Sequence, residues 1–221
     1  MKYILSVFLL FIIYSCKQKQ ENAKITTIDS VADTPDSVTN IQQPDEFLIT
    51  DTSFGKINKT TSYTELLNIF GKNNLQDTIN YIAEGTDSII VTKVYSNTPK
   101  EIIISWHKFH TAISTVDCYQ PNAPYHTADG LKIGSTLESL LKTNGKKITF
   151  TGTSWDYGGM ISSYHNGKYN NSKIYFRLTS SEDASESIMG DHELNTDMPL
   201  VKQNLKKIYI SNISLTLRNS R

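Results

Sequence analysis

A short amphipathic helix is predicted to start at residue 62. Ser62 and Glu65 have the spacing of a capping box, in which each side chain accepts a hydrogen bond from a backbone N–H group at the helix start. Leucine, isoleucine and phenylalanine follow at positions 66, 67, 69 and 70 and supply an apolar face. Gly71 then provides the left-handed conformation that often ends a helix.

The same pattern returns in residues 129–159, which carry the densest local signals of the chain. Ser135 and Glu138 repeat the capping-box spacing, and positions 140 and 141 repeat the leucine pair. Gly145 stands at the same distance from its leucine pair as Gly71 does from the first one. The sequence therefore predicts a second short helix of the same kind.

Each predicted helix is followed by runs of β-branched and aromatic residues separated by turn residues. The expected strands are residues 78–83, 88–95, 101–106 and 111–119 in the first half, and 147–153, 159–164, 174–179 and 207–217 in the second. The last run has apolar residues on both faces, which predicts either two covered faces or a β-bulge near Asn212. A short strand at 47–49 and one helical turn from Pro199 complete the predicted elements.

We expect an α+β fold that is dominated by sheet. Its two weakly similar halves, about residues 46–127 and 128–221, each consist of a short helix plus an antiparallel β-meander. A helix this short is unstable alone, so its leucines must pack on the sheet. The recurring helix-start, leucine-pair and glycine pattern is similar to the repeat of small envelope proteins with the β-lactamase-inhibitor-like fold, and the resemblance implies architecture rather than activity.

The N-terminus has the pattern of a secretory signal peptide at residues 1–15. Lys2 is followed by an apolar run from residue 4 to residue 14, which is shorter than the roughly 20 residues needed to cross a bilayer. Ser15 and Cys16 then resemble the lipobox of bacterial lipoproteins, which implies that Cys16 is acylated and becomes the mature N-terminus. The alternative is an ordinary signal peptide in which Cys16 is incidental. Two or three acyl chains hold a protein durably on a membrane.

Residues 16–45 are predicted to be a disordered tether that carries the lipidated cysteine. They are rich in Thr, Ser, Asp, Gln, Asn and Lys, and they lack apolar periodicity. Such a segment buries too little surface to offset the entropy cost of ordering it. The single α+β domain is therefore expected to occupy residues 46–221.

Three segments together resemble a group of Bacteroidota envelope lipoproteins of uncharacterised function: GLKIGSTLESLLKTNG, the loop WDYGG and the later MGDHEL. The resemblance implies an envelope lipoprotein. An acidic run directly after the cysteine is associated with surface export in that group, and the residues KQKQE that follow Cys16 lack one. We therefore expect the protein on the periplasmic face of the outer membrane.

Composition removes several classes of partner and cofactor. The chain has 22 Lys and Arg against 22 Asp and Glu and no basic cluster, which argues against a nucleic acid partner. Gly134, Ser135 and Thr136 lack the further glycines and the lysine of a phosphate loop, so no cofactor is expected. The other cysteine, Cys118, is expected to be a small buried side chain, the alternative being a reactive or intermolecular thiol.

Glu101, His107 and His110 form the one grouping of residue types that suits a metal ion. The histidines are three residues apart, which places both on one face of a helix but on opposite faces of a strand. Because the surrounding sequence predicts strand and loop, we assign no metal site and regard these histidines as exposed or edge residues. Paired carboxylates near residues 182 and 191 lie in a polar loop and are expected to be solvated.

Trp155, Asp156 and Tyr157 are the candidate binding residues. Two aromatic side chains beside an acid and a diglycine are typical of a recognition loop. The alternative is that both aromatics are core residues at the start of a strand, with the glycines forming a bulge. No Gly-x-Ser-x-Gly motif is present, and we assign no catalytic residue.

The sequence favours a non-enzymatic module, anchored in the membrane through acylated Cys16, that binds another protein or an envelope component. The alternative is an envelope hydrolase or metal-dependent enzyme built on His107, His110 and Asp156. The two hypotheses differ in whether Trp155, Asp156 and a histidine converge in one concave site.

Overall fold

The computed structural model describes residues 45–218. The predicted signal peptide (1–15), Cys16 and the tether up to residue 44 lie outside the described residues. Within residues 45–218, no helix has both the length and the apolar character needed to span a membrane.

The helices and strands are short. The helices are α1 (Tyr63–Phe70), α2 (Leu137–Asn144) and α3 (Pro199–Asn204), with single 3-10 turns at Lys72–Asn74, Ala83–Gly85 and Glu186–Ile188. The strands are β1 (Leu48–Ile49), β2 (Ser53–Phe54), β3 (Ile57–Asn58), β4 (Leu75–Ile82), β5 (Asp87–Val94), β6 (Ile102–Lys108), β7 (Ala112–Cys118), β8 (His126–Thr127), β9 (Thr149–Thr151), β10 (Ile161–Ser163), β11 (Ile174–Ser180), β12 (Glu193–Asn195) and β13 (Ile208–Thr216).

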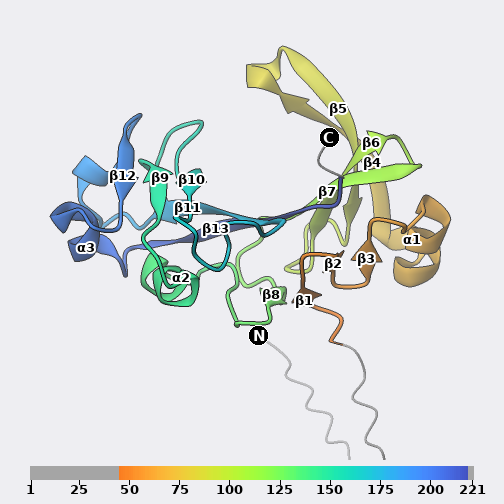
Figure 1. The fold of residues 1–221 in the computed structure, drawn as a ribbon. Helices are drawn as coiled ribbons and strands as arrows, with labels where there is room; N and C mark the ends of the chain where they lie inside the picture. Colours follow the sequence, from red (N-terminus) through yellow and green to blue (C-terminus); the bar gives the residue numbers. More distant parts are fainter. Residues whose placement is uncertain (1–44, 219–221) are drawn as a thin grey trace, which may run out of the picture. The chain divides into compact units, whose positions relative to one another are not determined.

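A six-stranded antiparallel sheet forms the centre of the domain, in the order β11-β13-β7-β6-β5-β4. Two small sheets, β3-β2-β1-β8 and β10-β9-β12, flank it. In Figure 1, α2 and the β1–β8 sheet lie below the central sheet, and β9, β10 and β12 rise above it. The fold is therefore α+β and sheet-dominated, as predicted. The central sheet takes strands from both halves, which joins them into one domain.

The first helix starts as its sequence predicts, but the second starts one residue later. Ser62 Oγ accepts a hydrogen bond from Glu65 N at 3.2 Å, and Glu65 Oε2 accepts one from Ser62 N at 2.7 Å. In α2 the capping residue is Thr136, whose Oγ1 accepts from the backbone N–H of residue 139. Ser135 instead accepts a hydrogen bond from the backbone N–H at residue 132. The predicted second capping box is therefore wrong, because Glu138 is one position too early to complete it.

Strand β13 contains the β-bulge predicted near Asn212. Its neighbour β11 pairs Arg177 with Asn212 and Leu178 with Ile210, so Ser211 has no partner across the ladder. The extra residue reverses the alternation of side chains. Ile208 and Ile210 face the core before the bulge, and positions 213, 215 and 217 face it afterwards.

The core lies between the central sheet and the helices. The first leucine of each predicted pair, Leu66 or Leu140, is fully buried, whereas the second is only partly buried. Cys118 belongs to this core, as expected. Burial raises the pKa of its thiol to about 11, so the reactive thiolate is scarce at neutral pH.

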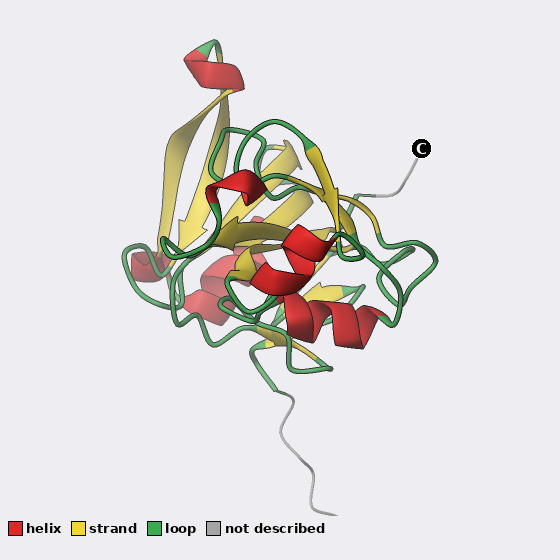
Figure 2. Ribbon diagram, turned by 90° about the vertical axis from the view of Figure 1, so that its left-hand side faces the viewer, coloured by secondary structure: helices red, strands yellow, loops and turns green. Residues whose placement is uncertain are grey.

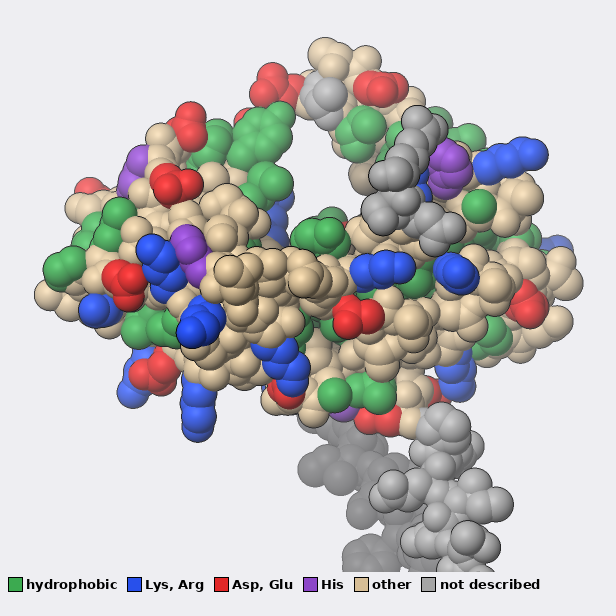
Figure 3. Space-filling model, in the orientation of Figure 1, with side chains coloured by type: hydrophobic (Ala, Val, Ile, Leu, Met, Phe, Trp, Pro, Cys, Tyr) green, Lys and Arg blue, Asp and Glu red, His purple; other side chains and the backbone are tan. Residues whose placement is uncertain are grey.

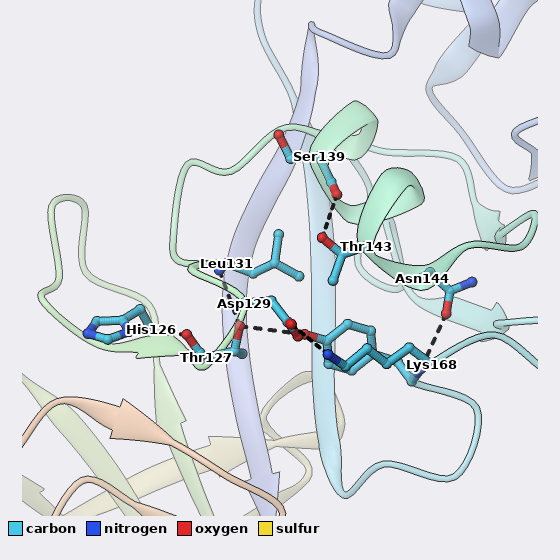
Figure 4. A network of polar contacts seen from close by, with 9 residues as sticks. His126, Thr127, Asp129, Leu131, Ser139, Thr143, Asn144 and Lys168 are labelled. Carbon is cyan, nitrogen blue, oxygen red and sulfur yellow. Dashed lines mark hydrogen bonds and ion pairs between the residues drawn. The ribbon is translucent and has the colours of Figure 1, made fainter. Parts of the chain in front are cut away.

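A buried amide fastens the loop after β10 to the end of α2. Asn144 Nδ2 donates to the carbonyls of Lys146 at 2.8 Å and Tyr164 at 3.0 Å, and its Oδ1 accepts from Tyr169 N at 3.2 Å. Nearby, Asp129 accepts from Lys168 Nζ at 2.5 Å and from the Tyr169 hydroxyl at 3.1 Å. Figure 4 shows the contacts of Asp129 with this loop, between the 127–131 turn and α2. These contacts fix the chain between β10 and β11.

The hairpin of β4 and β5 extends beyond the rest of the sheet. The two strands pair along their full lengths, but β6 pairs with β5 only at residues 91–94. Residues 79–90 are therefore a two-stranded ribbon that pairs with no third strand within residues 45–218, and it projects from the domain in both Figure 1 and Figure 2.

Candidate functional site

The strongest candidate site is a cavity of about 380 Å³ on the face of the central sheet that points away from the core. Side chains alternate along a strand, so the buried residues of β7, β13 and β11 leave their neighbours on this outer face. The upper side of the domain is hollowed between the ribbon and the β9–β10 region (Figure 3). The cavity is lined by Thr115, Tyr119, Met160, Ile161, Tyr175, Phe176, Arg177, Asn212, Ser214 and Thr216.

Three large side chains stand half exposed at this cavity. Tyr119 is 50% exposed, Met160 50% and Tyr175 53%. Single exposed apolar residues are common on protein surfaces, but a group around one cavity indicates a binding surface. A larger cavity of about 450 Å³ near residues 122–133 has no exposed aromatic side chain in its lining. The outer-face cavity is therefore the better candidate.

Arg177 connects the cavity floor to the loop that carries the predicted binding residues. Its Nε donates to the carbonyl of Gly158 at 2.8 Å, and its guanidinium also donates to the carbonyl of Asp156. Within residues 45–218 it forms no ion pair. The side chain therefore fixes the loop through neutral acceptors and keeps its positive charge at the cavity.

The predicted binding residues form a rim beside this cavity rather than part of its lining. Trp155 is half-buried and donates from Nε1 to the carbonyl of Gly152 at 2.8 Å. Its ring packs edge-on against Tyr157, with the ring centroids 5.6 Å apart. Tyr157 is 56% exposed, and Asp156 is exposed. The structure thus separates the two aromatics: Trp155 supports the loop, and Tyr157 faces solvent.

The glycines of this loop allow a close approach to β11. Gly159 has φ +71°, and its carbonyl accepts from Leu178 N at 2.8 Å. A Cβ atom at this position would overlap the carbonyl oxygen of Leu178. The loop therefore requires glycine here both for its backbone angle and for space.

Asp117 lies beneath the cavity and was not identified from the sequence. In the strand register it stands opposite Ser214, which in turn stands opposite Tyr175. Its carboxylate accepts from the Ser214 hydroxyl and from Thr115 Oγ1, the latter at 3.0 Å. Burial raises the pKa of Asp117, and hydrogen bonds from neighbouring side chains partly oppose this. The sequence does contain one indication of its position: Asp117 lies between two apolar residues of a strand, Val116 and Cys118, and so belongs to the face opposite the core.

The residues considered for a metal ion do not come together. Glu101 accepts from Asn97 N at 2.7 Å and from Gln120 Nε2 at 2.9 Å, which occupies its carboxylate in a loop. It lies six residues along the strand from His107, a distance of roughly 20 Å. Within residues 45–218, no group of three His, Cys, Asp or Glu side chains is placed to hold a metal ion. Glu101, His107 and His110 therefore do not form a shared site.

His110 belongs to an aromatic cluster instead. Its ring stacks between Tyr63 and Phe109, with centroid distances of 3.5 and 3.8 Å. Its Nε2 lies 3.0 Å from Asp77 Oδ2, although the two atoms do not form a hydrogen bond. His110 is thus partly buried between α1 and the β6–β7 turn, whereas His107 is exposed.

The residues of the enzyme alternative also lie apart. The loop of Asp156 is attached to β11, whereas His107 and His110 lie on β6 and on the turn after it. Strands β13 and β7 separate β11 from β6, which corresponds to about 14 Å across the sheet. No histidine lines the outer-face cavity. The geometry thus does not bring Trp155, Asp156 and these histidines into one concave site.

Comparisons with known proteins add one distant structural likeness. No protein-family model matches the chain, and no curated protein is significantly similar to it. The crystal structure of the uncharacterized protein yfeY from Escherichia coli aligns with a TM-score of 0.44 and 14% sequence identity. The alignment covers 76% of this chain and 98% of that one.

Gly159→Ala is predicted to destabilise the protein more than Gly130→Ala. Both glycines have a positive φ, which costs alanine about 1 kcal/mol. Only at Gly159 does the new methyl group also overlap backbone, which should add about 2 kcal/mol. Chemical denaturation of the two variants measures the difference. Equal losses would show that the loop is not held closely against β11.

Asp117→Asn is predicted to make stability less sensitive to pH. A carboxyl group whose pKa is raised in the folded state stabilises the protein fully below its unfolded pKa, and this contribution is lost as pH rises through the folded pKa. The free energy of unfolding of the wild type should therefore fall relative to that of the variant as pH rises above about 4, the usual pKa of an aspartate. Denaturation curves across this range test it, and a difference that is independent of pH would contradict it.

Proposed function

We propose that this protein is a lipid-anchored, non-enzymatic module of the bacterial cell envelope that binds another protein or an envelope component through the outer-face cavity. The observation that carries the binding role is the group of half-exposed side chains, Tyr119, Met160 and Tyr175, around one cavity. The anchoring role rests on the lipobox-like sequence that ends at Cys16.

The cavity has the physical properties of a prepared binding surface. Tyr119 follows directly after β7, and Tyr175 lies within β11. Their backbone is already ordered, so ligand binding would lose little conformational entropy there. Covering about 100 Å² of apolar surface stabilises a complex by about 2.5 kcal/mol before the costs of association. Polar groups of Asn212, Ser214 and Arg177 lie among the apolar ones and offer directional contacts.

The rim formed by Trp155, Asp156 and Tyr157 enlarges this binding surface. Arg177 holds the loop of Trp155, Asp156 and Tyr157 in place, so the exposed ring of Tyr157 and the carboxylate of Asp156 flank the cavity at a fixed position. We place the module on the periplasmic face of the outer membrane, with acylated Cys16 in the membrane, and we assign it no cofactor and no nucleic acid partner.

A photo-crosslinking amino acid at Tyr175 in the native lipoprotein is predicted to form a discrete adduct in the cells that make it. The matched control is Phe109, which is similarly exposed at 43% but lies on the turn after β6. The adduct at Tyr175 should weaken when Tyr119→Ser is added, because that change removes a neighbouring wall of the cavity. Equal labelling at both positions, or no effect of Tyr119→Ser, would contradict the proposed binding surface.

Cys16→Ser is predicted to move the protein from the membrane fraction to the soluble fraction, because it removes the acceptor of the acyl chains. A palmitate label should be incorporated by the wild type and not by the variant. Ser15→Ala serves as the control, since it keeps both a small residue before the cleavage site and the cysteine. Retention of the Cys16→Ser protein in the membrane would contradict the lipid anchor.

A further inference from the structure

The two edges of the central sheet differ in whether another chain segment covers them. At one edge, Leu178 N in β11 donates to the carbonyl of Gly159 at 2.8 Å, and Met160 forms a bridge with Arg177. At the other edge, β4 pairs only with β5 among the described residues. The main-chain groups on its outer side are therefore free to bind a further strand.

Strand β4 lacks most of the devices that normally protect an open edge. It contains no proline and no lysine, and it pairs with β5 over eight residues without a bulge. Its one charged residue, Asp77, is already engaged by Thr92 Oγ1 at 2.6 Å and by His110 at 3.0 Å. The edge is thus long, regular and nearly neutral.

The ribbon beyond the sheet also exposes apolar side chains on both of its faces. Ile79 (56% exposed), Tyr81 (70%) and Ile90 (48%) share one face, and Ile82 and Ile89 (37% each) share the other. These are five of the eleven large exposed hydrophobic residues in the described part of the chain. A two-stranded ribbon of this kind is marginally stable in water by itself. An added strand would cover part of both faces at once.

We propose that β4 of a second copy of this chain pairs antiparallel with β4 about a twofold axis at Ile79. This arrangement makes the two central sheets continuous and closes after two copies. It is independent of the proposed function, because it uses an edge of the sheet that does not line the outer-face cavity.

The positions of the charged residues favour a second copy of this chain as the partner, and they favour the register centred on Ile79. With Ile79 opposite Ile79, Asp77 stands opposite Tyr81, so the two carboxylates do not face each other. The same register brings Glu84, at the acidic end of one ribbon, near Lys72 of the second copy, which lies in the 3-10 turn just before β4. A register centred on Asp77 would instead oppose two carboxylates.

The test uses the full-length protein in the cells that make it, with single cysteine substitutions. Ile79→Cys is expected to form a disulfide-linked dimer, because directly opposed residues of antiparallel strands have Cα atoms about 5 Å apart, within the range of a disulfide. Ile90→Cys is the matched control. It lies on the same face, but the two copies of residue 90 would be about 14 Å apart, beyond disulfide reach.

Non-reducing electrophoresis distinguishes the outcomes. A dimer with Ile79→Cys and not with Ile90→Cys supports the proposal. Equal crosslinking of both variants, or crosslinking of Ile79→Cys to a different protein, overturns the assignment to a second copy.

A second measurement does not depend on an introduced disulfide. The detergent-solubilised wild type is expected to sediment as a dimer, and Ile79→Lys as a monomer with an unchanged circular dichroism spectrum. A wild type that remains monomeric over the concentrations present in the cell overturns the proposal.

Discussion

The domain depends on the two hydrogen-bonded ladders of β13. This last strand pairs with β7 from the first half and with β11 from the second, so it is the element that joins the halves into one sheet. It must also present apolar side chains to the core along its whole length. A strictly regular strand would turn some of them to the wrong face, and the bulge at Ser211 corrects this by resetting the alternation.

The features that the sequence predicted well are those encoded over a few residues. Ser62 and Glu65 define their helix start because the capping box is a local pattern, and most strands are bounded by local turn residues. The start of α2 was misjudged by one residue because Ser135 and Thr136 are adjacent hydroxyl residues and both can cap a helix. Only the turn at residues 132–135, which engages Ser135, decides between them.

The candidate site was much harder to predict, because it is assembled from distant strands. Asp117, Tyr175 and Ser214 meet only through the register of β7, β13 and β11, and no local pattern specifies that register. The loop of Trp155, Asp156 and Tyr157 stands out by its local composition, but its attachment to Arg177 does not, since about twenty residues separate them in the chain. The aromatic stacking of His110 was missed for the same reason, because Tyr63 comes from a different element.

The segment at Gly159 and Met160 that covers β11 has a consequence for how this sheet can grow. A β-sheet extends into a fibril only if each added strand leaves a new open edge for the next one. Here the β11 edge is already covered and cannot accept a further strand. Any pairing at the opposite, β4 edge therefore ends in an assembly of finite size. A short loop with a glycine in a left-handed conformation thus limits polymerisation, which is useful for any protein that is concentrated on a surface.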